Sequence, residues 1–162
     1  MRHMQNATIR RLVLAALVLA TCAGCSIVSG YNQQFKHASR FLPVDLAGAW
    51  EGTWHSEVTP HNGKLTAIFT RQDDYHYQAK FHAHFFKFFA YGYTVVLNVS
   101  PGDNCWVISG EKDLGQLAGG VYHYTGTATP CHFFSRYCCS KDHGEFEMRR
   151  VVTSCDAEAC GR

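Results

Sequence analysis

The stretch YHYQAKFHAHF, residues 75–85, decides the fold class of this chain. Its residues alternate in kind, so that one face holds Tyr75, Tyr77, Ala79, Phe81, Ala83 and Phe85, and the other holds His76, Gln78, Lys80, His82 and His84. Successive side chains of a β-strand point to opposite faces, whereas a helical stripe repeats about every 3.6 residues. The alternation therefore predicts a half-buried β-strand.

The same period of two recurs along the rest of the chain after residue 43, where no segment shows a helical stripe. It predicts strands at 46–56, 64–71, 75–87, 89–99, 105–111, 120–129, 131–138 and 144–152. Turn-forming residues separate them, as in His61-Asn62-Gly63 and Pro101-Gly102-Asp103-Asn104. We therefore expect an all-β antiparallel meander of about eight strands, closed or partly open as an up-and-down barrel. An aromatic-packed β-sandwich built from the same strands is the alternative.

The first 24 residues have the pattern of a secretory signal peptide. A polar segment with three arginines precedes the apolar run LVLAALVLA, residues 12–20, which is shorter than the roughly 20 residues of a spanning helix. Without residues 1–24, the chain keeps 15 − 3 = 12 basic residues against 13 acidic ones. The basic character thus belongs to the signal, and we expect no nucleic-acid partner.

Small residues follow the apolar run, and Cys22-Ala23-Gly24-Cys25 resembles the bacterial lipobox, although leucine is usual at the position of Cys22. The resemblance implies that Cys25 carries the lipid and becomes the first residue after cleavage. The protein would then be held in the cell envelope by its lipid anchor. Ser26 is not the acidic residue that retains some lipoproteins at the inner membrane, which favours the outer membrane. Ordinary signal cleavage, giving a soluble secreted protein, is the alternative.

These patterns divide the chain into four parts. Residues 1–24 are the expected signal peptide, which includes the signal helix, and residues 25–44 are a lipidated, flexible, polar tether with one helical turn near 32–39. Residues 45–153 form the β-barrel domain, and residues 154–162 form a cysteine-containing tail.

One short motif suggests the kind of barrel. Gly48-Ala49-Trp50 on the first predicted strand, with arginines on the last, resembles the signature of the lipocalin and avidin (calycin) barrels. In that family the tryptophan packs against an arginine of the closing strand. Arg150 shares a face with Phe146 and Met148, so the resemblance selects Arg150, with Arg149 as the alternative.

Aromatic residues on the inner faces suggest a ligand site. Besides Trp50, the candidates to line it are Trp54, Tyr77, Phe81, Tyr91, Tyr93, Trp106 and Tyr124, with space provided by Gly52, Ala79 and Ala83. The sequence therefore favours a non-enzymatic barrel that binds a small apolar ligand and needs no cofactor. The alternative is a structural or protein-interaction lipoprotein with a filled interior, which would use the histidine-rich face or an apolar patch near Phe86, Phe88 and Phe89.

The remaining residues able to do chemistry are cysteines and histidines. The six cysteines after Cys25 are expected to form disulfides, with 15 connectivities open: Cys105, Cys131, Cys138, Cys139, Cys155 and Cys160. Adjacent Cys138 and Cys139 should point to opposite faces. His82 and His84 share a face and are weak candidates for a metal site, but we expect an ordinary solvent-facing row. No Gly-x-Ser-x-Gly, His-Glu-x-x-His or phosphate-binding loop is present, so no catalytic residue is predicted.

Overall fold

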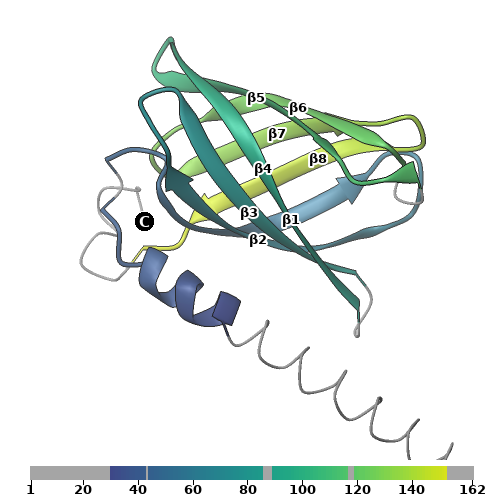
Figure 1. Cartoon of the computed structure of the whole chain (residues 1–162), viewed down its shortest axis with the longest axis horizontal. Helices are drawn as coiled ribbons and strands as arrows, with labels where there is room; N and C mark the ends of the chain where they lie inside the picture. The colour runs from purple at the N-terminus through teal and green to yellow at the C-terminus, as the bar shows by residue number, and fades with distance from the viewer. Residues whose placement is uncertain (1–29, 43, 86–88, 117–118, 153–162) are drawn as a thin grey trace, which may run out of the picture. The chain divides into compact units, whose positions relative to one another are not determined.

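The computed structural model describes residues 30–42, 44–85, 89–116 and 119–152. Its strands are β1 (Gly48–Ser56), β2 (Asn62–Arg71), β3 (His76–Phe85), β4 (Phe89–Gly102), β5 (Cys105–Asp113), β6 (Val121–Ala128), β7 (His132–Cys138) and β8 (His143–Arg150). Each strand pairs antiparallel with the next, and β1 also pairs with β8, which closes the sheet into a barrel (Figure 1). The predicted all-β meander is confirmed in its closed form, and the sandwich alternative is excluded.

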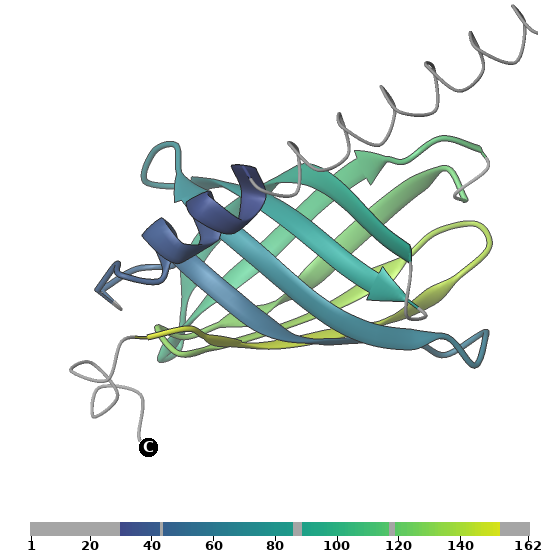
Figure 2. The same cartoon turned by 90° about the horizontal axis from the view of Figure 1, so that it is seen from below.

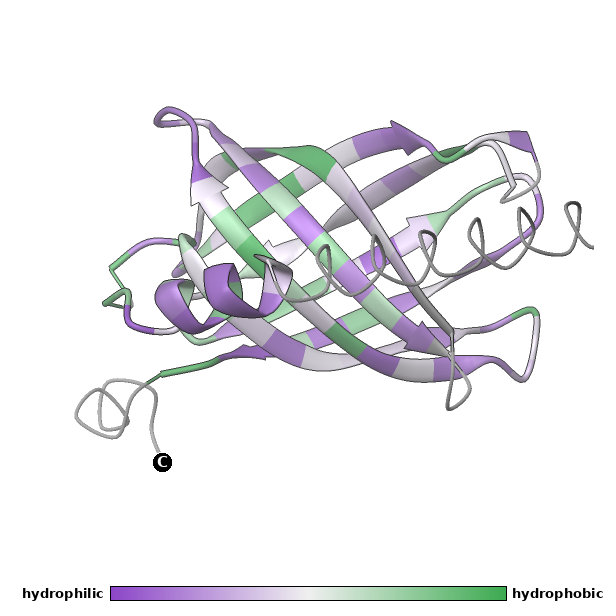
Figure 3. Ribbon diagram, turned by 60° about the horizontal axis from the view of Figure 1, so that its bottom comes forward, coloured by the Kyte–Doolittle hydropathy of each residue, from purple (hydrophilic) through white to green (hydrophobic). Residues whose placement is uncertain are grey.

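Alternation along each strand separates the interior from the surface. In β7 every second residue is buried, beginning with Phe133, and in β8 the buried set includes Phe146, Met148 and Arg150. Figure 3 shows the same alternation as hydrophilic and hydrophobic bands along the strands. Closure of the sheet leaves no exposed strand edge, so neighbouring strands satisfy the backbone hydrogen bonds, while the alternation buries the apolar face.

Several predicted boundaries differ from the structure. The predicted loop 101–104 is a two-residue turn, because β4 continues to Gly102 and Asn104 takes the left-handed conformation with φ at 58°. The segment predicted as a tether with one turn is helical over residues 30–38, which is more than two turns. β3 is described from His76 to Phe85, and the last two residues of the predicted strand, 86–87, lie outside the described residues. Within the described part of the chain, no helix combines the length and apolarity needed to cross a membrane.

The two ends of the barrel differ (Figure 2). We call the end with the β2–β3, β4–β5 and β6–β7 turns the packed end, and the opposite one, with the β1–β2 and β7–β8 turns, the open end. At the packed end the rings of Trp50, Phe69 and Phe133 contact one another with centroids 5.1 to 6.2 Å apart. All three rings are buried, and Leu46 is fully enclosed beside them. The described side chains of this half pack into one buried aromatic and aliphatic core.

A buried arginine completes the packed end. The guanidinium of Arg150 lies 4.7 Å from the ring centroid of Trp50 and donates hydrogen bonds to the backbone carbonyls of Asp45, Ala47 and Pro130. Burial lowers the pKa of Arg150 to about 10, which leaves it charged at neutral pH. Arg150, and not the exposed Arg149, therefore provides the cation that packs on the first-strand tryptophan.

Glycine is required at the start of β1 by this arrangement. Gly48 has φ at +142°, and a Cβ there would lie 2.5 Å from Nη1 of Arg150. The indole N–H of Trp50 donates to the carbonyl oxygen of Leu46 at 3.1 Å. The Gly48-Ala49-Trp50 motif thus combines a backbone conformation, a space for the guanidinium and a ring for it to cover.

Candidate functional site

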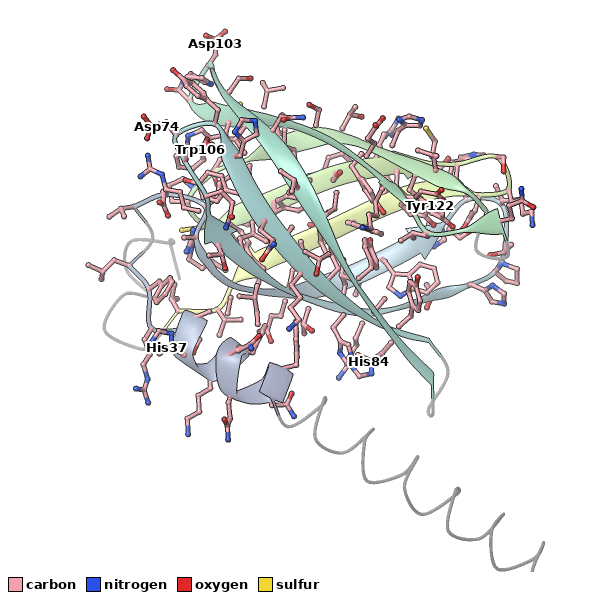
Figure 4. All side chains as sticks on the ribbon, in the orientation of Figure 1. His37, Asp74, His84, Asp103, Trp106 and Tyr122 are labelled. Carbon is pink, nitrogen blue, oxygen red and sulfur yellow. The ribbon has the colours of Figure 1, made fainter. Side chains whose placement is uncertain are left out.

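A cavity of about 320 Å³ opens at the open end of the barrel. We call it the aromatic cup, and the described residues that line it are Trp54, Ala83, Tyr91, Tyr93, Leu114, Tyr122, Tyr137, Asp142 and Phe146. Figure 4 shows Tyr122 at this end and Trp106 at the other. The volume falls near the lower bound of ligand pockets, which is roughly 300 Å³.

The cup exists because inward positions at the open end carry little or no side chain. Ala83 on β3 lines the cup. Gly63 on β2 and Gly144 on β8 hold inward positions where a Cβ would lie 1.8 and 1.9 Å from the backbone carbonyl oxygens of His84 and His55, so neither position admits a side chain. At the packed end, the inward positions of β2 and β8 instead carry the large side chains of Phe69 and Arg150. The sequence therefore leaves one half of the barrel hollow while it fills the other half.

The floor of the cup is a stack of buried rings. The ring of Phe81 lies 5.3 Å from that of Tyr93 and 5.5 Å from that of Phe146, and Tyr124 lies 6.0 Å from Phe146. Phe81 and Tyr124 are almost completely buried. A ligand in the cup would thus rest on the faces and edges of packed aromatic rings, which are held in place from below.

One carboxylate lies in the wall of the cup. Asp142, in the β7–β8 turn, accepts a hydrogen bond from the Ser56 hydroxyl at 2.6 Å and another from the Tyr137 hydroxyl at 3.1 Å. Ser56 is itself buried at the end of β1. The carboxylate is therefore fixed by two neutral donors from two different strands.

The phenols around the cup are held in their neutral form. Burial raises the pKa of Tyr137, and the negative charge of Asp142 raises it further. Burial likewise raises the pKa of Tyr122, with added effects from Cys139 and Asp142. Burial raises the pKa of Tyr93 well above its usual value. The cup thus presents protonated hydroxyls, which can donate or accept hydrogen bonds, among otherwise apolar walls.

The structure brings together some of the predicted lining residues. Trp54, Tyr91 and Tyr93 line the cup. Tyr77, Phe81 and Tyr124 are buried members of the filled core, and Trp106 packs against that core toward the packed end. Of the residues expected to provide space, Ala83 does so.

Other lining residues do not follow from the pattern. Tyr122, Tyr137 and Phe146 share the inward faces of their strands, so the alternation marked them as buried, and nothing in it placed them at the open end. Asp142 lies in a turn, where a carboxylate is ordinarily exposed. Ser56 shares the inward face of β1 with Trp50 and Trp54, and the structure buries it. A serine at an inward position is the sequence signal that a polar partner lies nearby.

The histidine pair lies on the outside of β3. The rings of His82 and His84 have centroids 4.7 Å apart, and partial burial, with the nearby His84 and Lys80, lowers the pKa of His82. Among the described residues, no group of three or more histidine, cysteine or acidic side chains is placed to hold a metal ion. Phe86 and Phe88 lie outside the described residues, as do the side-chain positions of 85–90.

The described cysteines divide between the two ends. Cys105 faces Gly102 at the packed end, whereas Cys138 faces His143 at the open end. These two thiols and that of Cys139 are free, while Cys131 is disulfide-bonded. Cys138 is exposed, and the sulfur of Cys139 is hydrogen-bonded with the phenol of Tyr122 at the rim of the cup. The predicted cysteines 155 and 160 lie outside the described residues, as does Cys25 with the whole signal peptide.

Comparisons of the chain with protein-family models, with curated proteins and with solved structures give no match.

Proposed function

We propose that this protein is a lipid-anchored protein of the cell envelope whose barrel binds a small, largely apolar ligand in the aromatic cup. The observation that carries the proposal is the contrast between the two halves of the interior. One half is filled by Trp50, Phe69 and Phe133, while the other is hollow and walled by aromatic rings. A barrel that needed only stability would gain from filling both halves, because interior cavities cost free energy.

The composition of the cup supports this class of ligand. Its walls are mostly aromatic side chains, with a small number of hydroxyls and one carboxylate to orient what binds. Preformed pockets for small molecules are lined in this way. The packed floor and the closed barrel hold the walls in position without a ligand, so binding would require little ordering of the protein.

The proposed location in the cell envelope depends on the sequence at the N-terminus. Residues 12–20 form the apolar run, and the lipobox-like Cys22-Ala23-Gly24-Cys25 follows. A lipidated Cys25 would place the barrel beside a membrane, since each buried CH₂ group of the attached chains contributes about 0.8 kcal/mol. The calycin-like arrangement of Gly48, Trp50 and Arg150 is compatible with a ligand-carrying barrel on such an anchor.

Ligand binding is tested with the neutral apolar dye N-phenyl-1-naphthylamine, whose fluorescence increases in an apolar site. The full-length protein should bind it saturably, and Ala83→Phe, which fills the cup, should weaken binding by about tenfold or more. The matched control is Gln78→Phe, which adds the same ring to an exposed position on the same strand. Equal binding by all three proteins, or no saturable binding by the wild type, would overturn the proposed binding site.

The lipid anchor is tested by the intact mass of the protein purified from membranes. An acylated chain that begins at Cys25 is expected, and Cys25→Ser should abolish both acylation and membrane association. Cys22→Ser is the matched control and should leave both unchanged. An unacylated wild-type chain would contradict the lipid anchor without affecting the test of the cup.

A further inference from the structure

The aromatic cup contains one carboxylate and, among its described lining residues, no basic side chain. Building on the proposed function, we propose that the ligand is an organic cation: a protonated amine on an apolar, preferably aromatic, body. The ammonium group would lie against Asp142, and the apolar body would lie among the rings.

The environment of Asp142 leaves its charge available. Both of its hydrogen-bond donors, Ser56 and Tyr137, are neutral hydroxyls. Among the described residues, no lysine, arginine or histidine forms an ion pair with this carboxylate. Each carboxylate oxygen accepts one of these bonds and keeps capacity for a second. A cationic donor could therefore bind without displacing the contacts that position the carboxylate.

The neighbouring lysine does not neutralise the site. Lys141 directly precedes Asp142, but its ammonium donates a hydrogen bond to the backbone carbonyl of Gln116 at 2.9 Å. It is thereby held to the β5–β6 link, outside the lining of the cup. The adjacent position on the other side, His143, is exposed and lies 3.5 Å from the carboxylate of Glu57. Both cationic or potentially cationic neighbours are thus directed toward other acceptors.

The aromatic walls favour the same charge. Tyrosine and tryptophan rings present electron-rich faces, which attract an ammonium or guanidinium group within about 6 Å. The Trp54 indole N–H donates to the carbonyl oxygen of His84, so this donor is engaged away from an incoming ligand. The field of Asp142 also extends across the cup, because it contributes to the raised pKa of both Tyr122 and Tyr137. A field that disfavours phenolate stabilises a bound cation by the same sign.

A neutral or anionic ligand would fit the walls less well. A neutral ligand would cover Asp142 without a cation to balance its charge, and burial of an uncompensated charge is costly. An anionic ligand would meet a like charge in a cavity whose described lining has no basic residue to balance it. The cup therefore discriminates by charge as well as by apolar area.

The experiment compares three ligands of nearly equal size by calorimetry and by displacement of the neutral dye: phenethylammonium, 2-phenylethanol and phenylacetate. The wild-type protein should bind the ammonium about tenfold more tightly than the alcohol, and the phenylacetate most weakly. Asp142→Asn should reduce the ratio of ammonium to alcohol affinity to about threefold or less, by weakening the ammonium and leaving the alcohol affinity unchanged or higher, since the charge that a neutral ligand would cover is gone. Asp103→Asn, an exposed turn position at the packed end, removes the same charge and should keep the wild-type ratio.

Each outcome decides one of the two proposals. Equal binding of ammonium and alcohol by the wild type, or an unchanged ratio in Asp142→Asn, overturns the charge preference and leaves the apolar binding site standing. Failure of every ligand and of the neutral dye overturns the proposed function itself. If Asp142→Asn does not fold, the order of the three affinities in the wild-type protein still decides the question, because it requires no substitution.

Discussion

The Ser56 hydroxyl donates a hydrogen bond to the Asp142 carboxylate across an oxygen–oxygen distance of 2.6 Å and a sequence separation of 86 residues. The same serine oxygen accepts hydrogen bonds from the backbone N–H groups of Val58 and Thr59 at 3.2 and 3.0 Å. It therefore joins the turn after β1 to the turn before β8, at the seam where the barrel closes. The carboxylate of the cup is positioned by barrel closure itself.

Ser56→Ala should lower the free energy of unfolding by about 1–3 kcal/mol, because it removes a buried hydroxyl with several partners and leaves them unpaired. Urea titration followed by tryptophan fluorescence measures the change. Thr53→Ala, an exposed position on the same strand, is the control and should change stability by about 0.5 kcal/mol or less. Equal effects of the two substitutions would show that the hydrogen bonds of the Ser56 hydroxyl do not stabilise the fold.

Arg150→Lys should destabilise the barrel by about 2–4 kcal/mol, since one ammonium cannot reach the three carbonyl oxygens that the planar guanidinium serves. Arg149→Lys changes the neighbouring, exposed residue and should leave stability nearly unchanged. Thermal unfolding by circular dichroism distinguishes the two. A mild effect at position 150, similar to that at 149, would contradict the role of the buried guanidinium.

Gly48→Ala should cost about 2–4 kcal/mol, because the new Cβ would meet the Arg150 guanidinium in a backbone conformation that L-residues rarely adopt. Gly92→Ala is the matched control, since a Cβ there meets only ordinary contacts on an exposed part of β4. Chemical denaturation of both variants gives the comparison. Wild-type stability of Gly48→Ala would show that the first strand can shift without loss.

Tyr124→Phe should leave the free energy of unfolding at pH 7 unchanged or slightly higher. The Tyr124 hydroxyl is buried and has no hydrogen bond to a described residue that meets ordinary geometry. Removing an unsatisfied polar group removes its desolvation cost. Tyr75→Phe, at a largely exposed position, is the control. A loss of more than about 1 kcal/mol in Tyr124→Phe would show that the hydroxyl has a partner, with the phenol of Tyr93 as the candidate.

The same residue predicts how stability changes in alkaline solution. Burial raises the pKa of Tyr124 from 10.0 to about 12, so the unfolded chain loses this proton at a lower pH than the folded one. The stability that depends on this phenol being protonated is therefore fully present below pH 10. It is lost, at about 1.4 kcal/mol per pH unit, as the pH rises from 10 toward 12. Urea titrations between pH 8 and pH 11.5 should give a shallower decline for Tyr124→Phe than for the wild type. Parallel declines would contradict the shifted titration.

The fold could be predicted from particular local patterns. The alternation in residues 75–85 determined the strand and its faces, and the same period fixed the inward set that ends in Arg150. Turn residues set the short links that make each pair of neighbours antiparallel. The errors lie at strand ends, as at Pro101, which the ladder includes because β4 and β5 pair as far as Gly102 and Cys105.

The candidate site could be predicted only in part. Trp54, Tyr91 and Tyr93 follow from aromatic content on inward faces, and so would Tyr77 and Phe81, which the structure places in the filled core. A period of two gives the side of the sheet on which a residue lies and says nothing of its height along the barrel axis. Height depends on register and strand tilt, which long-range pairings set.

The sequence by itself determined the period of two, the turns, the inward faces and the Gly48–Trp50 motif, because each depends on contacts between residues near in the chain. The tertiary structure alone decided which half of the barrel is hollow and which turn contributes a carboxylate to it. Closure of β1 on β8 brings Ser56 to Asp142, and no local pattern encodes that meeting. Long-range register converts a uniform alternation into a packed end and an open one.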